Sequence, residues 1–292
     1  MLSEAGENFK EWLIEKGLGM STAGDYSKFI ERKLLLWLEG HSFLIEHLEN
    51  QQLMHYIRYR KGAGIKPKTI NSELRKISYL LEFKGLPDIA GTIRVKGVQR
   101  RIPHDLFTEK ELDGIYNQFP GSRNPWTHED TLRRYHVILG LKIYQGLQEQ
   151  ELQKLETIHL QLDKGRIYIP STKRTNNRIL DLKPFQVLPL HDYLLTDRRA
   201  LYKNIEDDKR VFPASGLKRG MPRIREMINR YEPRLKSLHQ IRPSVITNWL
   251  NHFNLREAQY MAGHKYVSST ERYRMDNLED LQKELEKYHP LR

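Results

Sequence analysis

Hydrophobic spacing constrains this chain more than any other feature of its sequence. Apolar residues recur at the three- and four-residue intervals of an amphipathic helix over most of the 292 positions. In "KPKTINSELRKISYLLEFKGL", a helix start at Pro67 is followed by Ile70, Leu74, Ile77 and Leu81 on one stripe. The spacing therefore predicts a mainly α protein with little room for β-structure.

The period changes only in "GRIYIPSTKRTNNRILDL", where two short runs alternate around the polar turn "STKRTNN". Alternation with period two is typical of strands, so we predict a β-hairpin whose tip carries Lys173 and Arg174. After Gly216 we expect helices again, with breaks at Pro222, Pro233 and Gly263. The expected fold class is mainly α with a small β-hairpin or sheet (α+β).

A basic stretch, "RVKGVQRRIPH", divides the chain into two predicted domains. It has no acidic residue and no clean periodicity, which is typical of a linker. We predict a helical domain over residues 1–93, the linker over 94–104 and a mixed α/β domain over 105–292. The second domain opens with a capping box, in which Thr108 precedes Glu111 by three positions.

The last predicted helix, residues 277–288, has an apolar stripe of its own. The stripe consists of Leu278, Leu281, Leu285 and Tyr288. A terminal amphipathic helix must bury such a face on its own domain or on a neighbouring molecule.

The charge balance favours a polyanionic partner. Lys and Arg number 49 against 37 Asp and Glu, a formal net charge of +12, and the sequence pI is about 9.6. Because the C-terminal tail is acidic, the positive charge is concentrated elsewhere, as expected of a DNA-binding face. The alternative is a protein that happens to be basic. The candidate DNA contacts are Lys66, Lys68, Arg75, Lys76, Arg94, Lys96, Arg100, Arg101 and Arg174.

Absent residues and motifs narrow the chemistry further. There is no cysteine, which excludes disulfides and Cys-ligated zinc and indicates a reducing compartment. No apolar run is long enough to cross a bilayer, and the N-terminus lacks a signal peptide pattern. We find no phosphate-binding glycine loop, HExxH or Gly-x-Ser-x-Gly motif. We therefore expect a cytoplasmic, nucleoid-associated protein that needs neither metal nor cofactor.

Two C-terminal motifs contain residues suited to phosphate chemistry. In "LHQIRPS", His239 and Arg242 are three positions apart and face the same way on a helical turn. A guanidinium binds two phosphate oxygens, and an imidazole donates a hydrogen bond or moves a proton. In "AGHKYVSSTERYRM", His264 follows Gly263, where a helix is predicted to end. Helix capping, ordinary surface pairing and, for Lys173, simple solvation are the alternatives.

The order of these motifs resembles the tyrosine recombinase family, which includes phage integrases and the Xer and Cre recombinases. In that family, His-x-x-Arg is followed by Gly-His and, nine positions later, by a nucleophilic tyrosine. Here "HQIR" supplies His239 and Arg242, "GHK" supplies His264, and Tyr273 lies nine residues further on. Tyr266 does not have this spacing. The family's hairpin lysine corresponds to Lys173.

The resemblance implies an N-terminal core-binding domain and a C-terminal catalytic domain of the tyrosine recombinase type. It implies a site-specific recombinase or integrase that cuts and rejoins double-stranded DNA through a 3′-phosphotyrosyl intermediate. Tyr273 would attack, Arg242 and His264 would stabilise the phosphate, His239 would act as acid or base, and Lys173 would protonate the leaving oxygen. A homo-oligomer, dimer to tetramer, would assemble on DNA through the C-terminal helix.

One position departs from the family pattern. In "QGLQEQEL", Gly146, Leu147, Glu151 and Leu152 match the family's first box, with Glu151 as a supporting residue, but Gln148 replaces its arginine. Losing such a charge-assisted contact costs about 2–4 kcal/mol of transition-state stabilisation.

The sequence allows several replacements for this arginine and several alternative functions. The cations that could replace the missing arginine are Arg133, Arg134 and Arg174. The alternative functions are a catalytically weakened DNA-binding accessory protein, type IB topoisomerase-like relaxation, and a helical scaffold that binds protein.

Overall fold

The computed structural model describes residues 2–97, 105–119, 128–201 and 208–274. The chain divides into two compact units, residues 1–100 and 101–292. Of the predicted linker, residues 98–104 lie outside the described residues. Its first part packs on the N-terminal unit, because Val95 is buried there and its backbone exchanges two 2.8 Å hydrogen bonds with the Asn71 side chain.

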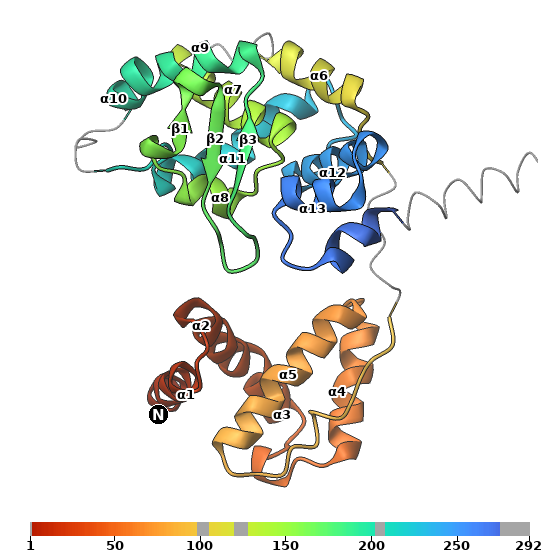
Figure 1. The fold of residues 1–292 in the computed structure, drawn as a ribbon. Coiled ribbons are helices and arrows are strands. Elements are labelled where there is room, and N and C mark those ends of the chain that lie inside the picture. The colour runs from red at the N-terminus through yellow and green to blue at the C-terminus, as the bar shows by residue number, and fades with distance from the viewer. Residues whose placement is uncertain (1, 98–104, 120–127, 202–207, 275–292) are drawn as a thin grey trace, which may run out of the picture. The chain divides into compact units, whose positions relative to one another are not determined.

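In the described residues of the N-terminal unit, all regular secondary structure is helical (Figure 1). Its α-helices are α1 (Leu2–Glu15), α2 (Met20–Phe29), α3 (Leu35–Gly40), α4 (Asn50–Gly62) and α5 (Pro67–Phe83). A π-helical segment, Ile30–Leu34, joins α2 to α3, and a 3-10 turn, Ile45–His47, precedes α4. The stripe predicted on α5 is buried along its whole length, which confirms the helical spacing.

The C-terminal unit combines helices with one small sheet. Its α-helices are α6 (Glu109–Gln118), α7 (Glu129–Tyr144), α8 (Glu149–Lys154), α9 (Pro184–Asp192), α10 (Arg198–Leu201), α11 (Ala214–Asn229), α12 (Ile241–His252) and α13 (Leu255–Ala262). Its shorter helical segments are Thr157–His159, Leu162–Lys164, Tyr193–Asp197 and Leu238–Gln240. Residues 267–274 are also helical and carry Tyr273. The predicted C-terminal helix, 277–288, lies outside the described residues. The mainly α fold with a small sheet is confirmed.

The sheet is antiparallel, with the order β1-β2-β3. The predicted hairpin is formed by β2 (Arg166–Ile169) and β3 (Arg178–Asp181), and β1 (Leu160–Gln161) adds a third strand that the sequence did not indicate. Ile167 pairs with Leu180, and both are buried, whereas the alternate residues face outward. The long loop between β2 and β3 extends beyond the sheet (Figure 1).

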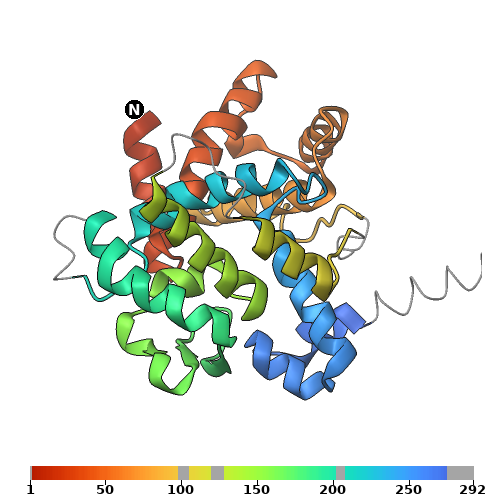
Figure 2. The ribbon, with the colours of Figure 1, turned by 90° about the horizontal axis from the view of Figure 1, so that it is seen from above.

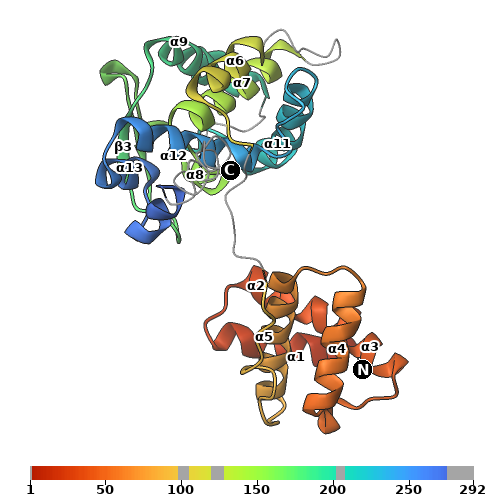
Figure 3. The same ribbon diagram turned by 90° about the vertical axis from the view of Figure 1, so that its right-hand side faces the viewer.

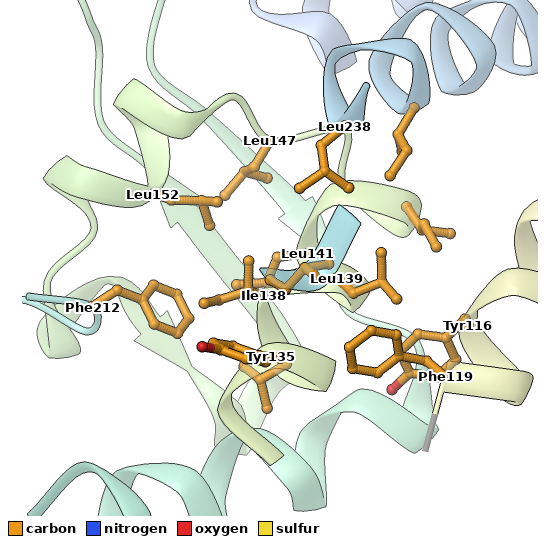
Figure 4. Close-up of a cluster of buried hydrophobic side chains, with 14 of the residues drawn as sticks. Tyr116, Phe119, Tyr135, Ile138, Leu139, Leu141, Leu147, Leu152, Phe212 and Leu238 are labelled. Atoms are coloured by element: carbon orange, nitrogen blue, oxygen red, sulfur yellow. The ribbon is translucent and has the colours of Figure 1, made fainter. Parts of the chain in front are cut away.

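Helix α7 is the centre of the C-terminal core. Ile138, Leu139 and Leu141 are fully buried, and Figure 4 shows Leu147 and Leu152 among the side chains gathered around this helix. Helix α9 packs along α7 (Figure 2), and α13 packs against both β3 and α12 (Figure 3). This packing fixes the turn that leads from α7 into α8.

The break expected at Pro222 is wrong, because α11 continues through this residue. A proline inside a helix removes the hydrogen bond to the carbonyl four residues earlier, here that of Lys218. Both Pro222 and Lys218 are on the exposed face, where water can bind that carbonyl. Burial of Leu217, Ile224 and Ile228 on the opposite face stabilises the helix as a whole.

Candidate active site

The turn between α7 and α8 presents Gln148. Gly146 adopts a left-handed conformation with φ 61°, and a Cβ there would lie 3.0 Å from the Trp249 ring, so any other residue would be strained at this position. Leu147 is fully buried and anchors the turn. Gln148 is the N-cap of α8, and its backbone N–H donates to Glu151 Oε2 at 2.8 Å. The Gln148 backbone is thereby fixed at the start of the helix.

A buried ion pair joins this turn to the hairpin. Glu151 Oε1 accepts from Arg178 Nη1 at 2.6 Å, and both side chains are completely inaccessible. Burial alone would raise the pKa of Glu151, but the hydrogen bond from Arg178 and the charges of Arg178 and Arg242 outweigh it and hold the pKa below its ordinary value. Glu151 is therefore a carboxylate at neutral pH.

Arg242, in the first turn of α12, is the second cation of the cluster. Its Nη1 lies 3.5 Å from Glu151 Oε2, and its guanidinium donates to the carbonyl oxygens of Gly146 and Ala262. With the Gln148 amide oxygen facing it, Gln148 accepts from Arg242 Nε at 3.0 Å and Nη2 at 3.2 Å.

Burial lowers the pKa of Arg242 to about 10, in the same direction as the charge of Arg178, while Glu151 and Tyr273 act in the opposite direction. The guanidinium is therefore still charged at neutral pH.

His264 is fixed between α13 and the residues that follow it. Gly263, with φ 66°, ends α13 as predicted, and a Cβ there would collide with the Arg178 guanidinium. His264 Nδ1 lies 2.8 Å from Thr270 Oγ1. Burial, followed by the charges of Arg242 and Arg178, lowers the pKa of His264 to about 4. The imidazole is therefore neutral at pH 7.

Tyr273 lies over this histidine. The two rings are stacked at 14°, with 6.1 Å between their centroids, and Tyr273 is half-buried. Tyr266, in contrast, is 73% exposed. The structure thus brings Gln148, Glu151, Arg242, His264 and Tyr273 together from three separate segments, which are the start of α8, the first turn of α12 and the residues after α13.

Two further predicted residues are exposed, unlike the buried Glu151 and Arg242. Lys173 is exposed in the β2–β3 loop, and His239 is exposed in the 3-10 turn before α12. The spacing of His239 and Arg242 predicted a shared face, yet Arg242 is buried. The loop is nevertheless attached to the site, because Thr175 pairs with His264 and the Asn176 N–H donates to the Gly263 carbonyl at 2.8 Å.

Arg178 is a member of the site that the sequence did not reveal. None of the three predicted replacements for the missing arginine is placed with Glu151: Arg133 binds Asp197 at 2.6 Å, Arg134 lies over the Tyr135 ring, and Arg174 is exposed in the loop. The alternation along β3 indicated only that Arg178 and Ile179 lie on opposite faces of the sheet. Only the burial of Glu151, which the structure shows, explains why a nearby cation is needed.

Most of the predicted DNA contacts are exposed where the structure describes them. Lys66, Lys68, Arg75, Arg94 and Lys96 are exposed on the N-terminal unit, whereas Arg100 and Arg101 lie outside the described residues. Lys76 differs from the prediction. It is half-buried, and its ammonium lies 5.2 Å from the centre of the Tyr26 ring and 5.0 Å from that of Phe29.

Neither a metal centre nor a membrane segment is found in the parts of the chain that the structure describes. Within these ranges, His, Asp and Glu side chains form no group of three that could hold a metal ion. No described helix combines the length and apolar character needed to cross a membrane.

The sequence of this chain is similar to those of known proteins. The phage integrase family model matches residues 107–279. The tyrosine recombinase XerA of Thermococcus kodakarensis is 24% identical over 297 residues, covering 98% of this chain and 95% of the relative. XerC of Pelotomaculum thermopropionicum is 25% identical, covering 97% of each chain. The TnP I resolvase of Bacillus thuringiensis is 24% identical, covering 97% of this chain and 99% of the resolvase.

Solved structures show the same fold. The Tn1549 transposon integrase in complex with transposon right end DNA has a TM-score of 0.68 at 14% identity, covering 97% of this chain and 98% of the integrase. The XerH site-specific recombinase bound to its difH substrate has a TM-score of 0.68 at 15% identity, covering 95% of this chain and 83% of XerH.

Proposed function

Because the chain belongs to the phage integrase family and is a site-specific tyrosine recombinase, we propose that it cuts and rejoins double-stranded DNA with Tyr273 as its nucleophile. One observation carries this assignment: Tyr273 stacks on the half-buried His264, whose pKa is lowered by desolvation and then by the charge of Arg242. A tyrosine held beside a desolvated guanidinium is placed where a phosphate can bind next to both.

The reaction is a transesterification. The Tyr273 phenol loses its proton, its oxygen bonds to phosphorus, and the bond from phosphorus to the 5′ oxygen of the next nucleotide breaks. This leaves a 3′-phosphotyrosyl link, and the departing 5′ oxygen takes a proton. A 5′-hydroxyl from a partner strand then attacks the link and releases Tyr273. The phosphodiester energy is conserved throughout, so the exchange consumes no nucleotide.

Each charged or polar neighbour has a proposed role. Arg242 stabilises the negative charge that develops on the phosphate oxygens. His264 acts as a neutral donor, with the Thr270 hydroxyl bonded to Nδ1 and the proton on Nε2. His239 accepts the proton of Tyr273, and Lys173 protonates the leaving oxygen. The attachment of the β2–β3 loop to His264 supports the role of Lys173.

We also propose that the basic residues of the N-terminal unit bind the DNA backbone. Exposed Lys66 and Lys68 flank the start of α5, and Arg94 and Lys96 are exposed further along the unit. Such contacts supply sequence-independent affinity that falls as the salt concentration rises. The cytoplasmic nucleoid is where these contacts would form.

The active assembly is proposed to be a homo-oligomer, from dimer to tetramer, joined by residues 277–288. The leucine stripe of this segment needs an apolar acceptor, and the C-terminal unit has a cavity of about 680 Å³ whose walls include Trp249, Phe253, Tyr260 and Met261. Truncation after residue 276 leaves Tyr273 in place. It should leave single-site DNA binding intact and abolish the higher complexes seen by native gel electrophoresis; their persistence would overturn this assignment.

A suicide substrate tests the proposed nucleophile. The substrate is a duplex selected from a random-sequence pool by its binding to the wild-type chain, with a nick placed at successive positions across the selected site. The wild type should form a covalent protein–DNA adduct, and Tyr273→Phe should form none. Tyr266→Phe is the matched control, because it removes an exposed phenol seven residues away and should leave the adduct unchanged.

The products distinguish strand exchange from the alternative functions. The relatives are recombinases and a resolvase, which favours joining of two duplexes over relaxation of one. An adduct followed only by religation of the same duplex would support topoisomerase-like activity. Binding without any adduct at any nick position would support an accessory role and overturn the proposed catalysis.

A further inference from the structure

Lys142 is a buried cation to which the proposed mechanism gives no role. It lies in the last turn of α7 between Leu141 and Ile143, and only 5% of the residue is exposed. Lysines are almost never fully buried without a partner. The only side-chain hydrogen bond of Lys142 among the described residues is from Nζ to the Leu147 carbonyl, at 3.3 Å.

This single bond joins Lys142 to the turn that carries Gln148. Leu147 immediately precedes Gln148, and its N–H donates back to the Leu141 carbonyl at 3.2 Å. Arg242 binds the Gly146 carbonyl, the neighbouring acceptor in the same turn. Two cations therefore bind consecutive carbonyls of the turn, one from α7 and one from α12.

The charged residues around the turn suggest a function for Lys142. Arg242 and Arg178 are cationic, Glu151 is anionic, and Gln148 is neutral where the resemblance places an arginine. Burial and then the charge of Arg242 lower the pKa of Lys142 to about 8, while Glu149 and Glu151 of α8 act in the opposite direction. At pH 7 the ammonium is therefore mostly present, and it adds one positive charge next to the uncharged position 148.

Helix capping alone does not account for this burial. A lysine near a helix C-terminus can bind the last carbonyls and interact with the helix dipole. A capping lysine normally keeps its ammonium in water while its methylenes lie along the surface. Here the ammonium is enclosed, and its pKa is lowered by the charge of Arg242, the residue proposed to bind the phosphate.

We propose that Lys142 is a positioning residue that supplies, from the buried side of the 145–148 turn, the positive charge that an arginine at position 148 would supply. This inference rests on the proposed function, because the charge is argued to act on the phosphate through Arg242 and the turn. Lys142 does not touch the DNA. Its charge holds the turn's carbonyls and raises the positive potential at the phosphate site.

A double-mutant cycle on adduct formation tests the proposal, with the nicked duplex described above. At pH 7, Lys142→Met should slow adduct formation about tenfold without changing DNA affinity. Gln148→Arg alone should not increase the rate of adduct formation, because Arg242, Arg178 and Lys142 already supply positive charge at the site. In the combined variant the arginine at position 148 should restore the rate to about the wild-type value. Lys164→Met, which removes an exposed lysine, is the control for net charge.

The pH profile separates a charge effect from a structural one. The wild-type rate should fall as pH rises through about 8, where Lys142 loses its proton. Lys142→Met should lack this decline. Methionine fits an apolar site and removes a buried charge, so thermal unfolding should show an intact fold.

Each outcome decides the matter. A Lys142→Met variant as active as the wild type, a loss that Gln148→Arg does not restore, or a decline near pH 8 that persists without Lys142 would overturn the relocation of charge. If the wild type forms no adduct, the proposed function itself fails, and this inference fails with it.

Discussion

Replacing Arg178 by methionine should destabilise the C-terminal unit strongly. The change leaves the Glu151 carboxylate buried, with the Gln148 N–H at 2.8 Å and Arg242 at 3.5 Å as its remaining partners. Removing one member of a buried ion pair costs about 3–5 kcal/mol, because the other charge stays uncompensated. For a unit of this size, this corresponds to a fall in Tm of about 10 °C.

The same hairpin supplies a matched control. Arg166 pairs with Asp181 at 3.1 Å, but both side chains are exposed, and such a pair contributes about 0–1 kcal/mol. Arg166→Met should therefore change stability little. Replacing Trp12 and Trp37 by phenylalanine throughout confines the tryptophan signal to the C-terminal unit, where Trp249 packs against Gly146.

Urea unfolding followed by this fluorescence compares the two variants. The pH dependence of the free energy of unfolding gives a second readout. Because the pKa of Glu151 is lowered in the folded state, ionised Glu151 stabilises the fold above its ordinary pKa, and this contribution is lost as the pH falls below it. The stability gap between wild type and Arg178→Met should narrow in acid. If Arg178→Met costs no more than Arg166→Met at neutral pH, the reasoning about the buried pair is refuted.

Three further predictions concern the site and the DNA. Gly263→Ala, which combines a left-handed φ with a collision, should cost about 2 kcal/mol or more in urea unfolding, whereas Gly165→Ala, with φ 62° but open space, should cost less. Because the pKa of His264 is lowered to about 4, the folded state should lose stability as pH falls from about 6.5 toward 4, and a His264→Asn variant titrated in parallel should lack this loss. Neutralising Lys66 and Lys68 should weaken binding to all duplexes and reduce the slope of log affinity against log salt by roughly 0.9 for each lost phosphate contact; an unchanged slope would remove α5 from the interface.

Local patterns were enough to predict the elements that local chemistry controls. The capping box of Thr108 and Glu111, the buried stripe of α5 and the hairpin all formed as expected. Their signals are short-range, because a cap bonds within one turn and an apolar period determines which face is buried. Pro222 failed as a signal, because packing of the opposite face outweighed the missing hydrogen bond.

The residues of the candidate site divide in the same way, into those that the sequence identified and those that only the structure identified. The spacing of His264 and Tyr273 was legible in the sequence because both residues lie in one short segment after α13. The charges that serve them were not legible. Arg178 and Lys142 come from a strand and a helix that are remote from that segment in the sequence. The position of a lysine or arginine in the sequence does not tell whether its side chain contacts water or a buried carboxylate. Only the tertiary structure, by packing β3 and α7 against the Gln148 turn, decided which cations are desolvated and therefore act strongly on the site.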